Sequence, residues 1–355
     1  MKISVLGAGA VGSMIGGLIK YYEPSADVVL VARGEHGHVL AQRQSVSLLG
    51  SWGMHNIALR TSLSPGEIAG SDAVIVTVKS QDTQQAMVDA APYLEDALVV
   101  SIQNGINDQA LEQFVARQRL VTGITTSKMA MVQPGTVSLQ VKGLIVVGPS
   151  RDGINQPASR QARNLLRLTG MKVAEHPNMM GIRYNNLIVD ALGFGSCLSA
   201  SSFVSDTVSH QLWRDYVGSP LLEESLEILR RARIRLSRIP GATDAFRMQG
   251  AFRLLDKPLL GRALQYLSNK IYGDRPMLAS LSQDLQRGKK TEVDAVNGHL
   301  VRLAHSVGFD VPYNELVQAS VHQLESRITE SYLAKNEVLR RFQSIAPRPR
   351  LRIAG

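Results

Sequence analysis

Cysteine is almost absent, because Cys197 is the only one in 355 residues. A single thiol cannot form an intrachain disulfide, which fits a reducing compartment. Long apolar runs are also missing, since no stretch approaches the ~18 apolar residues that a membrane helix needs. The first apolar run is short and turns at once into a glycine motif, unlike a signal peptide. These features predict a soluble, cytoplasmic protein with no membrane partner.

Aromatic residues are scarce at 5%, although the net charge is +9. Basic residues gather at the end of a helix-like segment (Arg230, Arg231, Arg233, Arg235, Arg238) and in a Pro-containing tail (Arg348, Arg350, Arg352). Positive charge is favourable at a helix C-terminus, and we expect the tail to be disordered. Basic and aromatic residues do not interleave, so we expect no nucleic-acid partner. An anionic cofactor and a small-molecule substrate account for a positive field equally well.

The most informative stretch is at the N-terminus, where MKISVLGAGAVGSMIGG joins a strand-like run to a helix-like one. The run Ile3–Leu6 is followed by glycines spaced G-x-G-x-x-G. The first glycine permits the tight turn, the second lets a pyrophosphate approach the backbone, and the third allows close packing of helix on strand. The free N–H groups of the helix N-terminus then attract phosphate. The predicted cofactor-binding residues are Gly7, Ala8, Gly9, Ala10, Val11 and Gly12.

A glycine-rich turn that binds nothing is the alternative, but the strand before it and the helix after it favour a dinucleotide site. The end of the second strand, Val28–Ala32, indicates which dinucleotide. A carboxylate there binds the ribose hydroxyl of NAD, whereas an arginine accommodates the 2′-phosphate of NADP. This chain has Arg33 followed by Gly34, and the first acid after them is Glu35. We therefore predict NADP as the cofactor. The alternative is that Arg33 is only a solvated surface residue.

Two further apolar runs, Asp72–Val78 and Ala97–Ile102, are typical of buried parallel strands. Lys79 follows the first run and Asn104 follows the second. Ligands of open α/β sheets bind at these carboxyl ends, so both residues are candidate site residues. The alternatives are a solvated lysine and an ordinary Asn-Gly turn.

The remaining pattern divides the chain at His176-Pro177-Asn178. We predict a doubly wound, Rossmann-like α/β domain over residues 1–177, a helical substrate or dimerisation domain over 178–342, a basic tail over 343–355, and a cleft between the domains. In the first domain, Ser45–Thr61 suggests a small strand excursion, and Val132–Gly148 predicts a β-meander that adds antiparallel strands to the sheet edge. Helices are predicted beyond it at Ile182–Ala200, Leu212–Ile234, Met277–Arg287, Thr291–Ser306 and Asn314–Leu324. A homodimer is left open.

Polar residues in two helical segments are candidates for chemistry. Asn186 and Asp190 are four apart and share a helix face, the alternative being a mutual hydrogen bond or water contact. Thr291 is a plausible N-cap, and Asp294 would complete a capping box with it. Glu292 can then be explained as a first-turn acid that stabilises a helix.

In these motifs the chain resembles the ketopantoate reductase family over nearly its whole length. The shared features are GAGAVG, VARG, VK, QNG, a Pro-Gly turn, SLSQDLQRGKKTEVDAVNG and VP. The resemblance implies NADPH-dependent reduction of a 2-oxo acid between the two domains. It implies that Lys79 and Asn104 lie beside cofactor and substrate, that Ser280 binds the substrate carboxylate, and that Glu292 contacts the cofactor ribose or a substrate hydroxyl. No metal site is expected.

One departure from the family is serious. The family carries a lysine as general acid and an asparagine four residues later, where this chain has Asn186 and Asp190. Asparagine cannot donate a proton as an ammonium does, and general acid catalysis contributes about 10²–10⁴-fold. A carboxylate 4 Å from an anionic substrate costs ~4 kcal/mol at an effective dielectric near 20.

Both changes argue against ketopantoate itself as the substrate. We therefore predict an NADP-dependent reductase of the ketopantoate reductase type. Asn186, Glu292 and Lys79 are its predicted catalytic residues, and Asn104, Asp190, Ser280 and Glu292 its predicted substrate-binding residues. The alternatives are a family reductase with a different carbonyl or imine substrate, and a non-catalytic NADP-binding protein.

Overall fold

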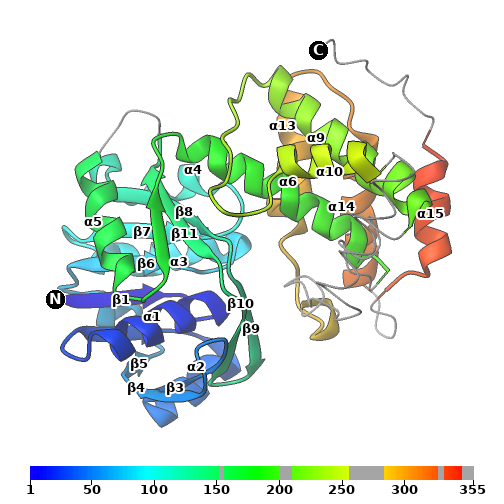
Figure 1. The fold of residues 1–355 in the computed structure, drawn as a ribbon. Helices are drawn as coiled ribbons and strands as arrows, with labels where there is room; N and C mark the ends of the chain where they lie inside the picture. Colours follow the sequence, from blue (N-terminus) through cyan, green and yellow to red (C-terminus); the bar gives the residue numbers. More distant parts are fainter. Residues whose placement is uncertain (152–155, 200–209, 256–283, 327–331, 346–355) are drawn as a thin grey trace. The chain divides into compact units, whose positions relative to one another are not determined.

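The structure, a computed structural model, describes residues 1–151, 156–199, 210–255, 284–326 and 332–345. The chain divides into two units (Figure 1). The first comprises Met1–Tyr184 with Ser237–Ala242, and the second Asn185–Leu236 with Thr243–Gly355. The split falls inside helix α6 (Met179–Cys197), slightly beyond residue 177.

The first unit is built on an eight-stranded sheet in the order β12-β11-β8-β7-β6-β1-β2-β5. Its strands are β1 (Lys2–Leu6), β2 (Asp27–Val31), β5 (Arg60–Ser62), β6 (Ala73–Val76), β7 (Leu98–Ile102), β8 (Leu120–Thr125), β11 (Leu144–Pro149) and β12 (Lys172–Glu175). Neighbours run parallel except β8 and β11. The order turns back on itself at β1, between β2 and β6, which confirms the doubly wound fold and sets the ligand-binding edge.

Both faces of this sheet are covered, which explains its continuous apolar strands. Successive side chains of a strand point to opposite faces. Val28 and Leu30 accordingly belong to one core with α1 (Ala10–Tyr22) and α5 (Gln156–Arg167). Val29 and Val31 belong to a second core with α3 (Thr83–Ala90) and α4 (Asp108–Leu111).

The predicted meander is wrong in one respect, because two of its strands leave the main sheet. Strands β9 (Lys128–Gln133) and β10 (Thr136–Val141) join β3 (Ser45–Gly50) and β4 (His55–Ala58) in a four-stranded sheet, and only β11 enters the main one. Apolar residues of β3 and β10 pack in the same core as α1. The small sheet thus covers the side of α1 that the main sheet leaves open, a contact that local alternation does not reveal.

In its described part the second unit contains helices and no strand. Apart from α6, these are α8 (Gln211–Trp213), the π-helix η5 (Arg214–Gly218), α9 (Ser219–Arg231), α10 (Ala245–Leu255), η6 (Val293–Ala295), α13 (Asn297–Ser306), α14 (Pro312–Glu325) and α15 (Lys335–Gln343). Among described residues, no helix is both long and apolar enough to cross a membrane.

Two predicted helices differ in detail. The segment Leu212–Ile234 is interrupted by η5 and ends at Arg231. The helix expected from Thr291 begins only at Asn297, after η6. Most of the helix predicted at Met277–Arg287, together with the tail arginines Arg348, Arg350 and Arg352, lies outside the described residues.

The basic cluster at the end of α9 is partly neutralised. Arg230 and Arg231 both bond to Glu227 at 2.7 Å. The hydrogen bond from Arg230 is the main cause that lowers the pKa of Glu227 to about 2, and Arg231 adds to it. Glu227 therefore stays ionised, which reduces the local positive field.

Candidate functional site

Each glycine of the N-terminal turn meets a different demand. Gly7 has a φ of +93°, and a Cβ there would lie 2.6 Å from the backbone nitrogen of Val78. A Cβ on Gly12 would lie 2.3 Å from Thr77 Oγ1 and 2.7 Å from the Gly7 carbonyl oxygen. A Cβ on Gly9 would meet nothing nearer than 4.0 Å. The outer two glycines are thus required by packing, whereas the space beside Gly9 is open.

Side chains that the sequence analysis missed hold this turn in shape. Thr77 Oγ1 donates to the carbonyl of Gly7 at 2.8 Å, and Ser13 Oγ donates to that of Ala8 at 2.9 Å. His36 Nδ1 accepts a backbone N–H from the β9–β10 turn at 2.9 Å, so its Nε2 carries the proton and donates to Ser13 Oγ at 3.1 Å. The turn is therefore held by Thr77, which follows β6, by Ser13 of α1 and by His36 of α2 (Gly34–Arg43), whose ring also bonds to the turn of the small sheet.

The residues present fit a dinucleotide. In an α-helix the first N–H groups have no carbonyl partner within the helix, here those of Ala10, Val11 and Gly12. They face the open side of the turn beside Gly9, a ready site for a pyrophosphate. Arg33 follows β2, is 65% exposed and forms an ion pair with Asp82 Oδ1 at 2.5 Å. No cluster of three or more potential metal ligands occurs among the described residues.

The contrast between Gly9 and Gly12 gives a paired prediction. Gly9→Ala is expected to leave the melting temperature nearly unchanged while it weakens NADPH binding about tenfold or more, because its methyl group fills the pyrophosphate space. Gly12→Ala is expected to lower both the melting temperature and the affinity for NADPH, because the turn and Thr77 must shift. Calorimetric binding and thermal unfolding measure the two effects. Equal NADPH affinity of Gly9→Ala and wild type would rule out a pyrophosphate at this turn.

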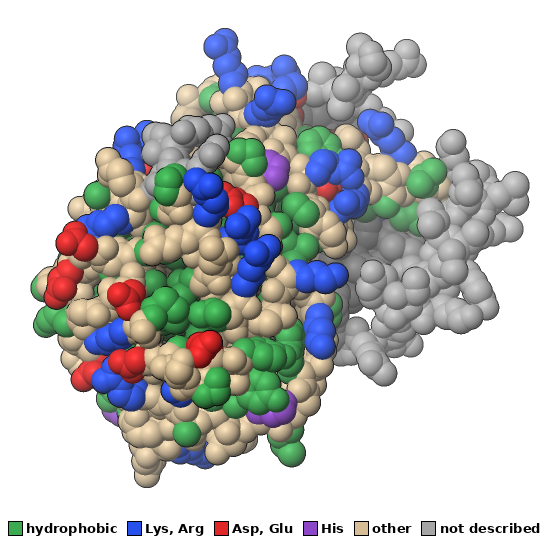
Figure 2. Space-filling model, turned by 60° about the vertical axis from the view of Figure 1, so that its left-hand side comes forward, with side chains coloured by type: hydrophobic (Ala, Val, Ile, Leu, Met, Phe, Trp, Pro, Cys, Tyr) green, Lys and Arg blue, Asp and Glu red, His purple; other side chains and the backbone are tan. Residues whose placement is uncertain are grey.

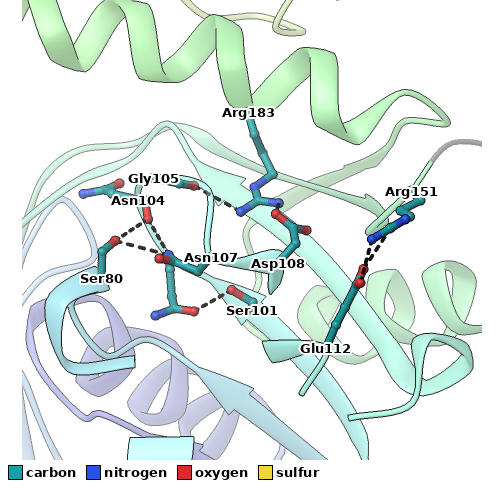
Figure 3. Close-up of polar contacts among 10 residues, drawn as sticks. Ser80, Ser101, Asn104, Gly105, Asn107, Asp108, Glu112, Arg151 and Arg183 are labelled. Atoms are coloured by element: carbon teal, nitrogen blue, oxygen red, sulfur yellow. Dashed lines mark hydrogen bonds and ion pairs between the residues drawn. The ribbon is translucent and has the colours of Figure 1, made fainter. Parts of the chain in front are cut away.

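Lys79 and Asn104 lie after adjacent strands, β6 and β7. Lys79 is half-buried and precedes the 3₁₀ turn η2 (Ser80–Asp82), whereas Asn104 is exposed. Ser80 Oγ and Asn107 Nδ2 both donate to the Asn104 carbonyl at 2.8 Å, as Figure 3 shows. Gln103 Nε2 donates to the carbonyl of Val78 at 2.8 Å. The two loops are therefore held together by hydrogen bonds, which fixes the backbone on either side of the candidate residues.

A buried arginine from α6 also contacts this loop. Arg183, 2% exposed, reaches the carboxylate of Asp108 at 2.5 Å and the Gly105 carbonyl at 3.1 Å (Figure 3). Asp108 is 7% exposed, so the ion pair is largely shielded from water. Burial raises the pKa of the neighbouring Tyr184, an effect that the charge of Arg183 partly opposes. The sequence analysis did not predict this pair. The signal was an arginine within an apolar helix, because a buried arginine needs a charged partner.

In the second unit, Asn186 and Asp190 are paired. Asn186 Nδ2 donates to Asp190 Oδ2 at 2.9 Å, and both side chains are half-buried. The mutual hydrogen bond considered as an alternative is therefore present. It orients the amide of Asn186 and holds the Asp190 carboxylate one helical turn further along α6.

Glu292 is 9% exposed and stands just before η6, where its carbonyl accepts the N–H groups of Ala295 and Val296 at 3.0 and 3.1 Å. The predicted capping box is wrong. The N–H of Thr291 goes to Glu325 at 2.7 Å and not to Asp294. Ser280, the predicted carboxylate-binding residue, lies outside the described residues.

Two models of one protein family match the chain. The model described as "Ketopantoate reductase PanE/ApbA" matches residues 3–152, and that described as "Ketopantoate reductase PanE/ApbA C terminal" matches 178–325. A 2-dehydropantoate 2-reductase of Pyrococcus horikoshii is 28% identical over 333 residues, which cover 92% of this chain and 98% of the relative.

Solved structures agree on the fold. A PanE/ApbA family ketopantoate reductase from Ralstonia eutropha JMP134 superposes with a TM-score of 0.74 at 24% identity, over 92% of this chain and 98% of that one. A D-mandelate dehydrogenase solved with NADH and anilino(oxo)acetate gives 0.75 at 20% identity, with the same coverage. These likenesses show that the two-part architecture is shared along nearly the whole chain.

Proposed function

The chain belongs to the ketopantoate reductase family, and from that premise we propose that it is an NADPH-dependent reductase of a 2-oxo acid, with ketopantoate as the expected substrate. The observation that carries the proposal is the glycine turn, whose open side at Gly9 meets the N-terminus of α1. The curated 2-dehydropantoate 2-reductase from Pyrococcus horikoshii, matched along 98% of its length, supports ketopantoate as the substrate, against the sequence-based argument from Asn186 and Asp190.

The proposed roles of the chain's residues follow from their chemistry. When bound, NADPH supplies the hydride that the substrate's carbonyl carbon takes up. The N–H groups at the start of α1 hold the pyrophosphate, and Arg33 holds the 2′-phosphate. Lys79 gives the carbonyl oxygen a proton, which the asparagine at position 186 cannot do. Asn186 and Asn104 donate hydrogen bonds that orient the acceptor, and Glu292 accepts one from a hydroxyl group.

The reaction is tested by following oxidation of NADPH by the purified chain with ketopantoate, other 2-oxo acids and imines, beside an NADH control. Turnover of ketopantoate with a preference for NADPH is the expected result. Turnover of imines or of other oxo acids without ketopantoate would assign another substrate. NADPH binding with no turnover across the panel would leave a non-catalytic binding protein.

The exposed Arg33–Asp82 ion pair gives a prediction for cofactor choice. Arg33→Ser is expected to weaken NADPH binding by roughly tenfold or more and NADH binding little, since a hydrogen bond to a charged group contributes about 1.5–3 kcal/mol. Asp82→Asn is expected to tighten NADPH binding, because it frees Arg33 from a competing anion. Arg60→Ser is the matched control, since Arg60 pairs with Asp27 at 2.9 Å with similar exposure. Equal loss for both cofactors in Arg33→Ser would contradict the role.

We further propose three properties of the enzyme. It works in the cytoplasm, it binds no nucleic acid, and it forms a homodimer. The lone cysteine is consistent with a reducing compartment. On the face in Figure 2, basic side chains lie among acidic, hydrophobic and other polar ones. Light scattering of the purified chain tests the dimer, and a mass of one chain would contradict it.

A further inference from the structure

One face of α14 is lined by polar side chains. Asn314, Gln318, His322 and Glu325 are spaced by four, four and three residues, so they lie along one side of the helix. All four bond to the same short stretch, residues 291–297, which contains Glu292. We call this stretch the TEVDAVN segment. Its backbone is not a regular helix until Asn297, so its shape depends on these contacts.

The strongest contact lies beside Glu292. Glu325 Oε1 accepts the N–H of Thr291 at 2.7 Å and its hydroxyl at 2.6 Å. The same hydroxyl oxygen accepts the N–H of Val293 at 3.2 Å. The residues on both sides of Glu292 are thus held through one carboxylate. Hydrogen bonds to a charged acceptor are about twice as strong as neutral ones, which makes this an effective anchor.

A second contact holds the middle of the segment. Asp294 Oδ1 accepts from Gln318 Nε2 at 2.6 Å and lies 3.0 Å from His322 Nε2. Gly298 permits this approach of the two helices, because a Cβ there would lie 2.7 Å from Gln318 Nε2. Asp294 is exposed, so these bonds contribute less than the anchor at Glu325.

The far end of the segment is held in the interior. Asn297, fully buried, donates to Asn314 Oδ1 at 2.9 Å. Asn314 donates its own amide and backbone N–H groups to Glu224 Oε1, both at 2.8 Å. Glu224 is 6% exposed and also accepts the N–H of Tyr313 at 3.2 Å, so it caps the N-terminus of α14. The segment is therefore fixed at both ends to one rigid helix.

We propose that the polar face of α14 orients Glu292 for the reaction and that Glu325 is its main positioning residue, an inference that rests on the proposed function. Glu325 acts through the backbone of Thr291, and no contact with substrate or cofactor is ascribed to it. A misplacement of about 1 Å at a reacting group can cost on the order of 10²-fold in rate. A carboxylate remote from the chemistry therefore controls how well Glu292 reaches its hydroxyl partner.

The first arm of the test measures the segment itself by amide hydrogen exchange in the full chain. Glu325→Ala is expected to speed exchange across residues 291–297, because the N–H and hydroxyl of Thr291 lose their acceptor. Glu325→Gln keeps an acceptor oxygen and is expected to restore slow exchange. Glu315→Ala, a glutamate on the same helix that contacts His305 and not the segment, is the matched control. Unchanged exchange in Glu325→Ala would overturn the proposal.

The second arm asks whether the effect passes through Glu292. Glu325→Ala is expected to lower kcat/KM for the 2-oxo acid about tenfold, and to lower it little further in a Glu292→Gln background. A loss of equal size in both backgrounds would show general damage and overturn the positioning role. Absence of turnover in the wild type would instead overturn the proposed function, and the exchange arm would still decide whether α14 holds the segment.

Discussion

Replacing Asn186 by lysine and Asp190 by asparagine together is expected to raise kcat for ketopantoate reduction, by less than the about 10²–10⁴-fold that a general acid usually contributes, because Lys79 already supplies a proton from another position. The double variant recreates the pair that the family resemblance implies. Asn186 donates an amide hydrogen to Asp190 at 2.9 Å in this chain, and an amide has no proton to transfer to the forming alkoxide. An ammonium at the same position has one.

The single variants separate the two effects. Asn186→Lys alone is expected to gain less, because the adjacent carboxylate of Asp190 stabilises the ammonium and makes it a weaker acid. Asp190→Asn alone is expected to lower KM for an anionic substrate, since it removes a repulsion of up to ~4 kcal/mol at 4 Å. Steady-state kinetics of all four proteins form a double-mutant cycle. No gain in either lysine variant, with the fold intact by circular dichroism, would show that Asn186 does not occupy the acid position.

Arg183→Met is expected to destabilise the first unit by about 3–5 kcal/mol, because it leaves the buried carboxylate of Asp108 without its partner. It also removes the donor to the Gly105 carbonyl, so the loop after β7 loses a support beside Asn104. The affinity of Arg183→Met for NADPH is expected to fall together with its free energy of unfolding. The double variant Arg183→Met with Asp108→Leu is expected to recover most of the stability, since an apolar pair of similar size replaces the buried charges.

Tryptophan fluorescence can measure the loss of stability of the first unit separately from that of the second. The chain has two tryptophans, Trp52 in the first unit and Trp213 in the second. In a Trp213→Phe background, urea unfolding followed at Trp52 reports on the first unit alone. Arg151→Met is the matched control, because its pair with Glu112 is exposed on the arginine side, and it is expected to cost less than about 1 kcal/mol. Equal losses for Arg183→Met and Arg151→Met would contradict the structural role of the buried pair.

The parts of the fold that the sequence predicted are those set by local pattern. The glycine turn and strands β1, β2, β6 and β7 each lie in a short apolar run with a distinctive end. The small sheet was not predictable, because alternation in residues 132–148 indicates strands without indicating their partners. The partner of β10 outside the meander is β3, far earlier in the chain.

The same distinction applies to the candidate site. Lys79, Asn104 and Arg33 were predicted as site residues because they follow strand ends, where ligands of open α/β sheets bind. The contact between Arg183 and Asp108 joins residues 75 apart, and that between Thr291 and Glu325 joins residues 34 apart. In the second contact Glu325 takes the N–H that a capping box would have used. A 3₁₀ turn over Val293–Ala295 follows, and the regular helix begins only at Asn297.

In the proposed reaction, hydride passes from the nicotinamide to the carbonyl carbon of a 2-oxo acid. The most direct measurement is a single turnover with ketopantoate and NADPH deuterated at both C4 positions, with the product analysed by mass spectrometry. The expected product is pantoate that carries one deuterium on the former carbonyl carbon. Bound NADPH with no deuterium transferred to ketopantoate or to any other oxo acid would contradict it.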